Sequence, residues 1–310
     1  MDNSTKEIFF VLQGVDDTRT NKQIYFALAL LTYLLTVFSN LMLITTIFLD
    51  KTLHEPMYFF ICNLCVNGIY GSSGFYPKLL VDLLSEICLI SYTGCLIQVF
   101  VIYNYMFCEF TNLTVMAYDR YVAICKPLQY QSIITPQRAG RLVLLIWLVC
   151  LLEVSVGTIL TSILPICGYE INRPYCFNVA VVKLACTETP LNRTFGAVLM
   201  MFYFAQAVYI VITYIYIIRA SLRSKAGQGK FMQTCLPHLV TFINFALSVT
   251  FDIMYEFFGN SNTNVAFRNI LAVQFLIVPP LLNPVIYGMK LSRIRMSLMK
   301  ILNQGVRALT

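Results

Sequence analysis

The sequence predicts an all-α membrane protein: a bundle of seven transmembrane helices that forms a single domain over residues 1–310. Composition is the first reason, because 58% of the residues are hydrophobic and only 12% are charged, too few to cover a soluble globule. Spacing is the second reason. Seven nearly charge-free runs are each long enough to cross about 30 Å of hydrocarbon. The loops between them leave no room for a second domain.

Each run gives one helix, in order along the chain. The predicted helices cover about 24–49, 56–82, 91–122, 140–164, 194–220, 230–257 and 266–288. The polar residues 1–23 show no cleavable signal peptide, so the first helix is expected to act as its own insertion signal. Residues 289–310 are expected to form a short amphipathic helix and a tail on the inner leaflet.

The distribution of charge predicts the orientation of these helices. With the N-terminus outside, 14 of the 22 Lys and Arg residues fall on the cytoplasmic side. Cytoplasmic loops of membrane proteins carry an excess of Lys and Arg, and such a surface attracts anionic lipid. The net charge of +7 is therefore explained by topology, and nucleic acid is not needed as a partner.

The end of the third predicted helix carries an Asp-Arg pair, Asp119-Arg120, within Met116–Cys125. Charge is costly inside hydrocarbon and is tolerated at such an edge. An Asp can hold the neighbouring Arg in an ion pair in one state and release it in another. This gives a two-state element that a ligand at the far side can bias.

Two other intramembrane features suggest function. Pro284 follows Asn283 inside the seventh apolar run, where it removes a helical hydrogen bond and bends the helix, so that Tyr287 can swing. Glu109 lies three turns above Arg120, near mid-membrane, where an acid usually marks function. Glu153, in the fourth helix, is expected to be a neutral, hydrogen-bonded structural acid.

Four motifs together resemble the odorant receptors, which are rhodopsin-like G-protein-coupled receptors, over almost the whole chain. They occur in the same order and at the same membrane depth as in that family. They are LHEPMYFF at 53–60, MAYDRYVAIC at 116–125, KFMQTCLPHL at 230–239 and PPLLNPVIY at 279–287. The loop after the fourth helix adds three Cys with similar spacing, at Cys167, Cys176 and Cys186.

The resemblance implies roles for particular residues. It pairs Cys95 with Cys176 and Cys167 with Cys186, where the outer face permits disulfides. The odorant pocket would be lined by Ile102, Tyr103, Met106, Phe107, Phe202, Val249, Thr250 and Ile253. The activation switch would comprise Asp119, Arg120, Tyr214, His238, Asn283, Pro284 and Tyr287. Asn3 and, with weaker support, Asn192 lie in N-glycosylation sequons.

The chain departs from the family pattern at three places. Similar receptors bind sodium between two acids and polar groups of the seventh helix, but Asn67 replaces the second-helix acid. Two alternatives therefore remain open for the charge of Glu109. A sodium ion binds near Asn67, Glu109 and Asn283, or Glu109 is protonated. Ile102 stands where amine receptors carry an Asp, although Asp252 and Glu256 keep a cationic ligand open. In the sixth helix, Phe245-Ala246 stands where odorant receptors more commonly carry Phe-Tyr. This difference suggests a divergent branch resembling fish receptors.

The sequence therefore predicts a plasma-membrane receptor, not an enzyme, which binds a small, largely apolar odorant and activates a stimulatory G protein of the olfactory type. A non-olfactory rhodopsin-like receptor for another small ligand is the alternative, since the fold does not dictate the ligand. A transporter is more remote, because no duplicated halves are visible. No cofactor is expected, and a sodium ion remains open as described above.

Overall fold

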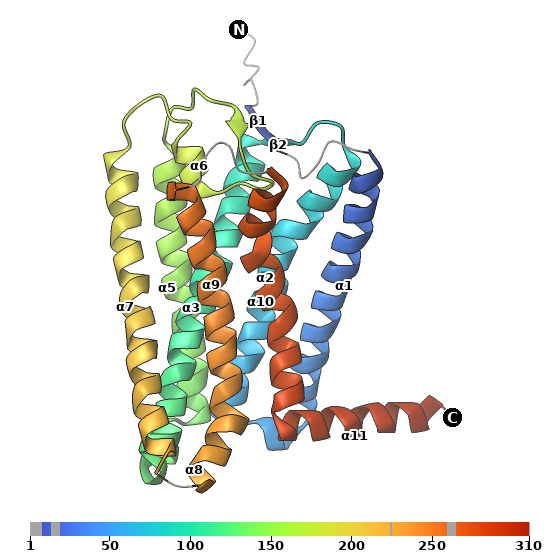
Figure 1. Ribbon diagram of the computed structural model, residues 1–310, viewed down its shortest axis with the longest axis vertical. Helices are drawn as coiled ribbons and strands as arrows, with labels where there is room; N and C mark the ends of the chain where they lie inside the picture. The colour runs from blue at the N-terminus through green and yellow to red at the C-terminus, as the bar shows by residue number, and fades with distance from the viewer. Residues whose placement is uncertain (1–7, 14–18, 224, 259–264, 310) are drawn as a thin grey trace.

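Long helices build almost the entire protein. The structure is a computed structural model, and it describes residues 8–13, 19–223, 225–258 and 265–309. Seven long helical segments run side by side in this part of the chain, and an eighth helix lies across one end of the bundle (Figure 1). The segments are α1 (Arg19–Leu49), α2 (Pro56–Leu84), α3 (Tyr92–Cys125), α5 (Pro136–Ser162), α7 (Pro190–Ser221), α9 (Leu236–Phe258), α10 (Val265–Lys290) and the crossing α11 (Ser292–Leu309).

Short elements connect the long helices. They are η1 (Lys51–Leu53), η2 (Pro127–Gln129), α4 (Tyr130–Ile133) and α6 (Asn178–Val182). The sixth membrane segment enters α9 through α8 (Lys225–Lys230) and a π-helical stretch, η3 (Phe231–Cys235). Inserted π turns are common at functional sites.

Several helices begin earlier than their apolar runs predict. The first, fourth, fifth and sixth segments begin at 19, 136, 190 and 225, where 24, 140, 194 and 230 were expected. The fourth shows the reason: Pro136 occupies the first turn, and the Thr135 hydroxyl accepts a hydrogen bond from the Arg138 backbone N–H. Prolines and N-caps start helices in polar sequence, ahead of the membrane, where hydropathy gives no signal. At the other end, α3 continues to Cys125.

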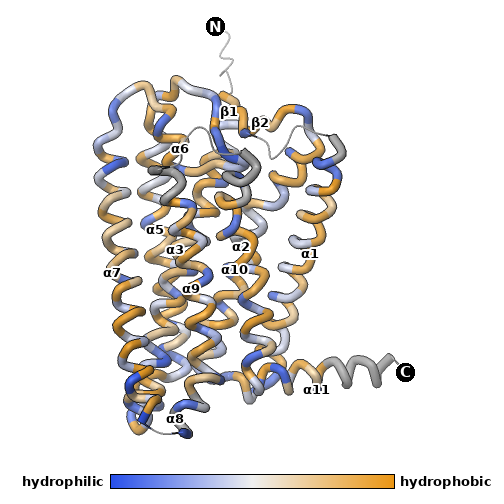
Figure 2. Tube along the Cα trace, viewed as in Figure 1, coloured by the Kyte–Doolittle hydropathy of each residue, from blue (hydrophilic) through white to orange (hydrophobic). Residues whose placement is uncertain are grey.

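Most residues along the long helices are hydrophobic, and hydrophilic residues are more frequent toward the two ends of the bundle (Figure 2). Six helices in the described part of the chain are long and apolar enough to cross a membrane. Helix α2 is as long as these, but it contains Asn63, Asn67 and Ser72, all buried. It contacts α1, α3, α5 and α10, so these polar groups face neighbouring helices.

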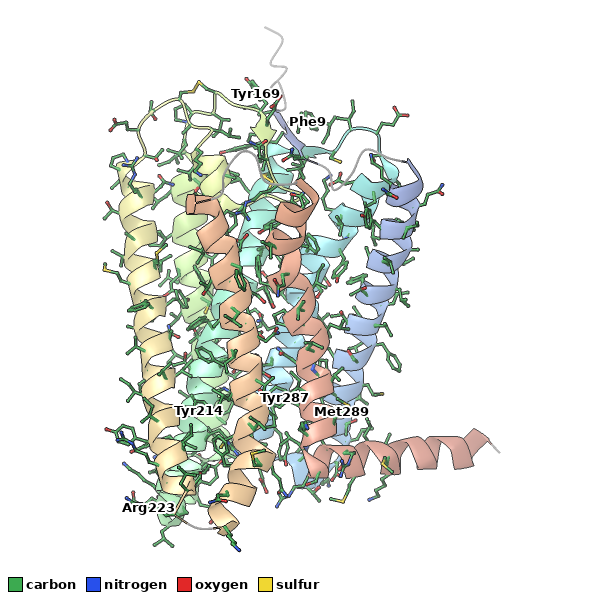
Figure 3. All side chains as sticks on the ribbon, viewed as in Figure 1. Phe9, Tyr169, Tyr214, Arg223, Tyr287 and Met289 are labelled. Atoms are coloured by element: carbon green, nitrogen blue, oxygen red, sulfur yellow. A yellow bond between two sulfur atoms is a disulfide. The ribbon has the colours of Figure 1, made fainter. Side chains whose placement is uncertain are left out.

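A small sheet covers one end of the bundle, called here the strand end. Strand β1 (Phe9–Leu12) pairs antiparallel with β2 (Leu89–Ser91) and parallel with β3 (Glu170–Ile171). Figure 3 shows Phe9 and Tyr169 at this end. The sequence predicted only a polar segment before the first helix, so the strand is an addition. It buries Phe10 in a cluster with Ile90 and Cys176.

The opposite end, called the α11 end, is tied together by polar contacts between α11 and the α1–α2 loop. Arg293 pairs with Glu55 at 2.6 Å, and the Ser297 hydroxyl donates to Asp50. Hydrogen bonds from Ser297 and Thr52 lower the pKa of Asp50 from 3.8 to about 2, so that carboxylate is ionised at neutral pH. These contacts fix where α11 leaves the bundle.

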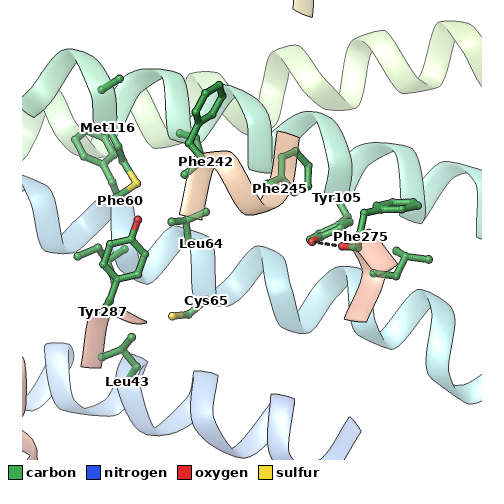
Figure 4. Close-up of a cluster of buried hydrophobic side chains, with 14 of the residues drawn as sticks. Leu43, Phe60, Leu64, Cys65, Tyr105, Met116, Phe242, Phe245, Phe275 and Tyr287 are labelled. Atoms are coloured by element: carbon green, nitrogen blue, oxygen red, sulfur yellow. Dashed lines mark hydrogen bonds between the residues drawn. The ribbon is translucent and has the colours of Figure 1, made fainter. Parts of the chain in front are cut away.

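Prolines shape α10, and neighbouring helices compensate for them. Pro279 has no N–H for the carbonyl of Phe275, which instead accepts a bond from the Tyr105 hydroxyl at 3.0 Å. Pro284 likewise leaves the carbonyl of Pro280 open, and the Asn40 side-chain amide donates to it at 2.8 Å. Figure 4 shows the first of these bonds within the buried cluster. A bent α10 is thus anchored to α1 and α3.

Candidate functional site

The predicted Asp-Arg pair lies at the α11 end of α3 and is closed in the structure. Arg120 is 8% exposed and its Nε donates to Asp119 Oδ2 at 2.8 Å, with a second contact from Nη2. The other carboxylate oxygen accepts from the Tyr130 hydroxyl of α4 at 2.8 Å. The guanidinium is therefore held beside its own helix, paired with Asp119.

A second polar cluster joins α7, α9 and α3 nearby. Tyr214 of α7 donates to Nδ1 of His238, and their rings are stacked within 7° of parallel. His238 Nε2 lies 3.0 Å from the carbonyl oxygen of Leu113. Because a carbonyl can only accept, Nε2 carries the proton and Nδ1 accepts from the phenol. His238 thereby links α9 to α3.

Tyr287 and Asn283 of α10 lie on the buried side of their helix. Figure 3 labels Tyr214 and Tyr287 at a similar depth near the α11 end. In Figure 4 the phenol oxygen of Tyr287 points toward Phe60 and Met116. Among the described residues it makes no hydrogen bond of good geometry, and the Thr241 hydroxyl of α9 is the polar group that interacts with it. The phenol thus lies one turn after Pro284, facing α9 rather than lipid.

Glu109 lies at the centre of the bundle and is fully buried. One carboxylate oxygen accepts from the Asn67 amide nitrogen at 2.9 Å, and the other accepts from the Asn283 amide nitrogen at 2.6 Å. The two amide oxygens have no partner among the described residues. One carboxyl group therefore joins α2, α3 and α10, and rotating either amide would turn an oxygen toward it.

Aromatic rings gather between α3, α7 and the α5–α7 loop, closer to the strand end. Tyr103 lies 5.8 Å from Phe107 and 5.4 Å from Phe177 of the loop, centroid to centroid. Phe107 stacks on Tyr203 of α7 at 4.5 Å. The Tyr203 hydroxyl donates to Glu153 of α5 at 2.6 Å. We call Tyr103, Phe107, Phe177 and Tyr203 the aromatic layer.

Most of the predicted pocket residues are buried or half-buried, and two are exposed. Ile102 and Phe107 are buried, whereas Tyr103, Met106, Val249 and Ile253 are half-buried. Phe202 is 46% exposed and Thr250 is also exposed, so the prediction that they line the pocket is corrected. Tyr203 takes the inward position on α7, and Asp252 is buried on α9. Helix α7 is apolar on every side, so its sequence does not indicate which of its residues face the interior of the bundle.

Both disulfides implied by the family resemblance are present at the strand end. Cys95 of α3 is joined to Cys176, and Cys167 is joined to Cys186. The first bond tethers the loop to α3, directly beside Phe177. The backbone N–H of Cys176 also donates to Gln98 of α3 at 2.9 Å. The loop residue of the aromatic layer is thus fixed by covalent and hydrogen bonds.

The two predicted glycosylation sites lie near the N-terminus and at the start of α7. Asn3 lies outside the described residues. Asn192 lies in the first turn of α7, and its amide nitrogen donates to Thr161 at 3.3 Å. The described residues contain no cluster of three His, Cys, Asp or Glu side chains suited to a metal ion. A small pocket at the strand end is lined by residues including Lys22, Asp82 and Pro174 and contains no predicted ligand residue.

Seven long helices, a buried Asp-Arg pair and a proline-bent seventh segment define a rhodopsin-like membrane receptor. Comparison with known proteins agrees: the family model described as "Olfactory receptor" matches residues 29–305. Olfactory receptor 5M5 of Mus musculus is 33% identical over 96% of this chain and 94% of its own length. Olfactory receptor 8I2 of Homo sapiens is 32% identical over 97% of each chain. The chain belongs to the olfactory receptor family of G-protein-coupled receptors.

Membership of the olfactory receptor family establishes the broad function of the protein. The protein is a multi-pass receptor of the plasma membrane and not an enzyme. The described helices agree with that location, since six of them can span a bilayer by length and composition.

Proposed function

We propose that the protein binds a small, largely apolar odorant in the aromatic layer and activates a stimulatory heterotrimeric G protein at the α11 end. The observation that carries this proposal is the course of α3. This helix contributes Tyr103 and Phe107 to the layer and Arg120 to the opposite end. The two sites are about 25 Å apart at 1.5 Å per residue. One continuous helix therefore connects them.

The strand end faces the outside in this proposal. Both disulfides lie there, and disulfides persist in oxidising surroundings. The excess of Lys and Arg falls at the α11 end, as expected for a cytoplasmic face. Leu291, directly before α11, and Ile294 in its first turn are buried, while Arg293 and Arg295 are exposed. This amphipathic pattern suits a helix lying on anionic lipids of the inner leaflet.

Recognition of the ligand depends mainly on shape and dispersion. The aromatic layer presents ring faces, and the hydroxyl of Tyr203 is already bonded to Glu153. Met106 and Ile102 of α3 add apolar surface beside it. A small apolar molecule gains many weak contacts in such surroundings, whereas a strongly polar one loses its hydration.

Activation requires the contacts at the α11 end to change. Outward movement of α9 breaks the bond from His238 to the Leu113 carbonyl, which holds α9 against α3. Release of Arg120 from Asp119 frees the guanidinium to face the opening cleft. Packed helices change between discrete arrangements, so a small displacement of α3 by ligand can be amplified at its far end. The G protein occupies the cleft that results.

Glu109 sets the resting state through either a sodium ion or a proton. The unpartnered amide oxygens of Asn67 and Asn283 fit a sodium ion, because together with the carboxylate they supply three oxygen ligands. Bound sodium would neutralise the carboxylate and hold α2, α3 and α10 together. A proton on Glu109 would neutralise the same charge, and turning one of the two amides would give the new O–H an acceptor oxygen.

Replacing Glu109 with Gln should change basal signalling or the ligand dose–response without preventing delivery to the cell surface. The substitution keeps the shape of the side chain and removes its charge. Asn67→Asp should make activation more sensitive to sodium, because it supplies a second carboxylate. Cyclic-AMP assays at two sodium concentrations, at equal surface expression, measure both effects. Unchanged signalling by Glu109→Gln would make Glu109 a structural residue, and no sodium gain by Asn67→Asp would favour the proton.

The odorant proposal is tested by expressing the receptor in cells and screening a broad odorant panel with a cyclic-AMP readout. A saturable response that requires the receptor supports it. A response to a peptide or lipid, with none to odorants, would favour the alternative of a non-olfactory receptor of the same fold. Ligand-driven uptake without any second-messenger response would favour a transporter.

Adjacent residues on α7 provide a matched test of the ligand site. Tyr203→Ala removes the ring that stacks on Phe107 and should raise the half-maximal odorant concentration about tenfold or more, because the ligand loses the contact area of a whole ring, worth about 1.4 kcal/mol or more. Phe202→Ala removes an outward-facing ring of similar size and should change it less than about threefold. Equal effects, or a larger effect at Phe202, would place the ligand elsewhere.

A further inference from the structure

Glu153 of α5 is a half-buried acid to which the proposed function assigns no role. It lies between α5 and α7, where the Tyr203 hydroxyl donates to its Oε2 at 2.6 Å. A carboxyl group is costly within a bilayer unless it is hydrogen-bonded. The bond to Tyr203 offsets part of that cost and joins the acid to a ring of the aromatic layer.

The part of α7 that carries Tyr203 is loosely packed. The structure describes all of α7, and its buried residues lie only from Ile210 onward, toward the α11 end. Before Ile210 one face is half-buried, and it contains Phe195, Leu199 and Tyr203, whereas the adjacent Phe202 is exposed. Lipid accepts an apolar ring as readily as a helix interface does. Apolar packing alone therefore gives the Tyr203 ring little reason to stay inside the bundle.

The hydroxyl adds a directional contact that fixes this ring. One face of Tyr203 stacks on Phe107 with their centroids 4.5 Å apart, and Phe110 meets it edge-on at 5.8 Å. At the tip of the ring the hydroxyl is bonded to Glu153, and the Thr111 side chain of α3 also interacts with it. Of these two polar contacts, the one to Glu153 is the hydrogen bond of good geometry. The ring is thus held between α3 and α5.

We propose that Glu153 is a positioning residue of the ligand site, which holds Tyr203 against Phe107 and thereby sets the sensitivity of the receptor to its odorants. A site that is already ordered binds more tightly, because less conformational freedom is lost when the ligand arrives. The role requires an acceptor oxygen at the end of the side chain and no charge. This inference rests on the odorant site proposed above.

Removing the acceptor should weaken the response to odorants. Glu153→Leu should raise the half-maximal odorant concentration about threefold to tenfold, which corresponds to the loss of one hydrogen bond. Glu153→Gln keeps an acceptor oxygen in the same place and should stay within about twofold of wild type. The maximal response at equal surface expression should not change in either variant, because the contacts at the α11 end are untouched.

Removing the donor provides the second half of a double-mutant cycle. Tyr203→Phe keeps the ring and deletes the hydroxyl, so it should reproduce the effect of Glu153→Leu. The double variant should be no less sensitive than the weaker single variant, because both substitutions remove the same bond. Cyclic-AMP dose–response curves for a panel of odorants, at matched surface staining, measure these effects.

Two hydroxyls on the same helices provide matched controls. Tyr209→Phe removes a hydroxyl from an exposed ring of α7. Ser155→Ala removes one that donates to the Leu151 carbonyl of its own helix, α5. Neither hydroxyl joins the two helices, so both variants should respond as wild type does.

Several results would overturn the role of Glu153. These are an unchanged response of Glu153→Leu, a loss in Glu153→Gln as large as that in Glu153→Leu, additive losses in the double variant, or equal losses in the controls. If Glu153→Leu fails to reach the surface, Tyr203→Phe is compared with Thr111→Val. A loss in Tyr203→Phe alone supports the proposal, and equal losses, or none, contradict it.

The same measurements separate this inference from the proposed function. A large loss in Tyr203→Ala with none in Glu153→Leu leaves the ligand site in place and refutes only the positioning role. Equal effects of Tyr203→Ala and Phe202→Ala place the ligand elsewhere, and the site and the positioning role then both fail. A wild type silent to every odorant contradicts the proposed function itself.

Discussion

Arg120→Ala should abolish G-protein activation while the receptor still reaches the cell surface and binds its ligand. The guanidinium lies at the α11 end and is paired with Asp119, about 25 Å from the aromatic layer. Removing it should leave ligand affinity within the 1–3 kcal/mol or so that is typical of allosteric coupling. Cyclic-AMP response and surface staining are measured together. A normal response would refute the switch assigned to Arg120.

Two further variants separate loss of the switch from general damage. Arg141→Ala removes an exposed positive charge at the start of α5 and should leave signalling unchanged. Asp119→Asn weakens the ion pair while keeping the hydrogen bond from Tyr130 possible, and should raise basal signalling. If Arg141→Ala also silences the receptor, total charge at this face, and not the pair, controls coupling.

Cys95→Ser should remove most of the folded receptor from the cell surface. The bond to Cys176 closes a separation of 81 residues and fixes the loop that carries Phe177. Loss of a native disulfide typically costs about 2–5 kcal/mol, which is a large part of the stability of a protein. Surface staining and thermal stability of the solubilised receptor measure the loss.

Cys88→Ala is the matched control for this disulfide. Cys88 belongs to the same buried cluster but to neither disulfide, so its replacement should have a much smaller effect. Peptide mapping without reduction provides the independent check. Cys95 recovered as a thiol, or joined to Cys88, would contradict the pairing.

The sequence alone was enough to locate the features that depend only on residues close together in the chain. Seven apolar runs must become helices in a bilayer, because no water is present there to satisfy exposed backbone groups. Asp119, Arg120 and Pro284 could be identified for the same reason, since charge and missing N–H groups stand out within apolar helices. The family resemblance added the disulfide pairing, which four cysteines alone leave open.

The tertiary structure decided which side of each helix faces inward. Helix α7 is apolar all round, so only its packing shows that Tyr203 contacts Phe107 while Phe202 faces outward. Membrane helices bury side chains against one another and against lipid, and both surroundings accept apolar residues. In this protein, hydrophobic periodicity is therefore a weak guide to which side of a helix faces inward.

Contacts between distant segments also required the fold. The strand Phe9–Leu12, the bond from Asn40 to the carbonyl of Pro280 and the pair of Arg173 with Asp252 each join residues from separate parts of the chain. Their formation depends on the path of the loops and the relative positions of the helices, which no local pattern encodes. The sequence thus determined the helices and the buried charges, and the packing of those helices decided what each charge and ring contacts.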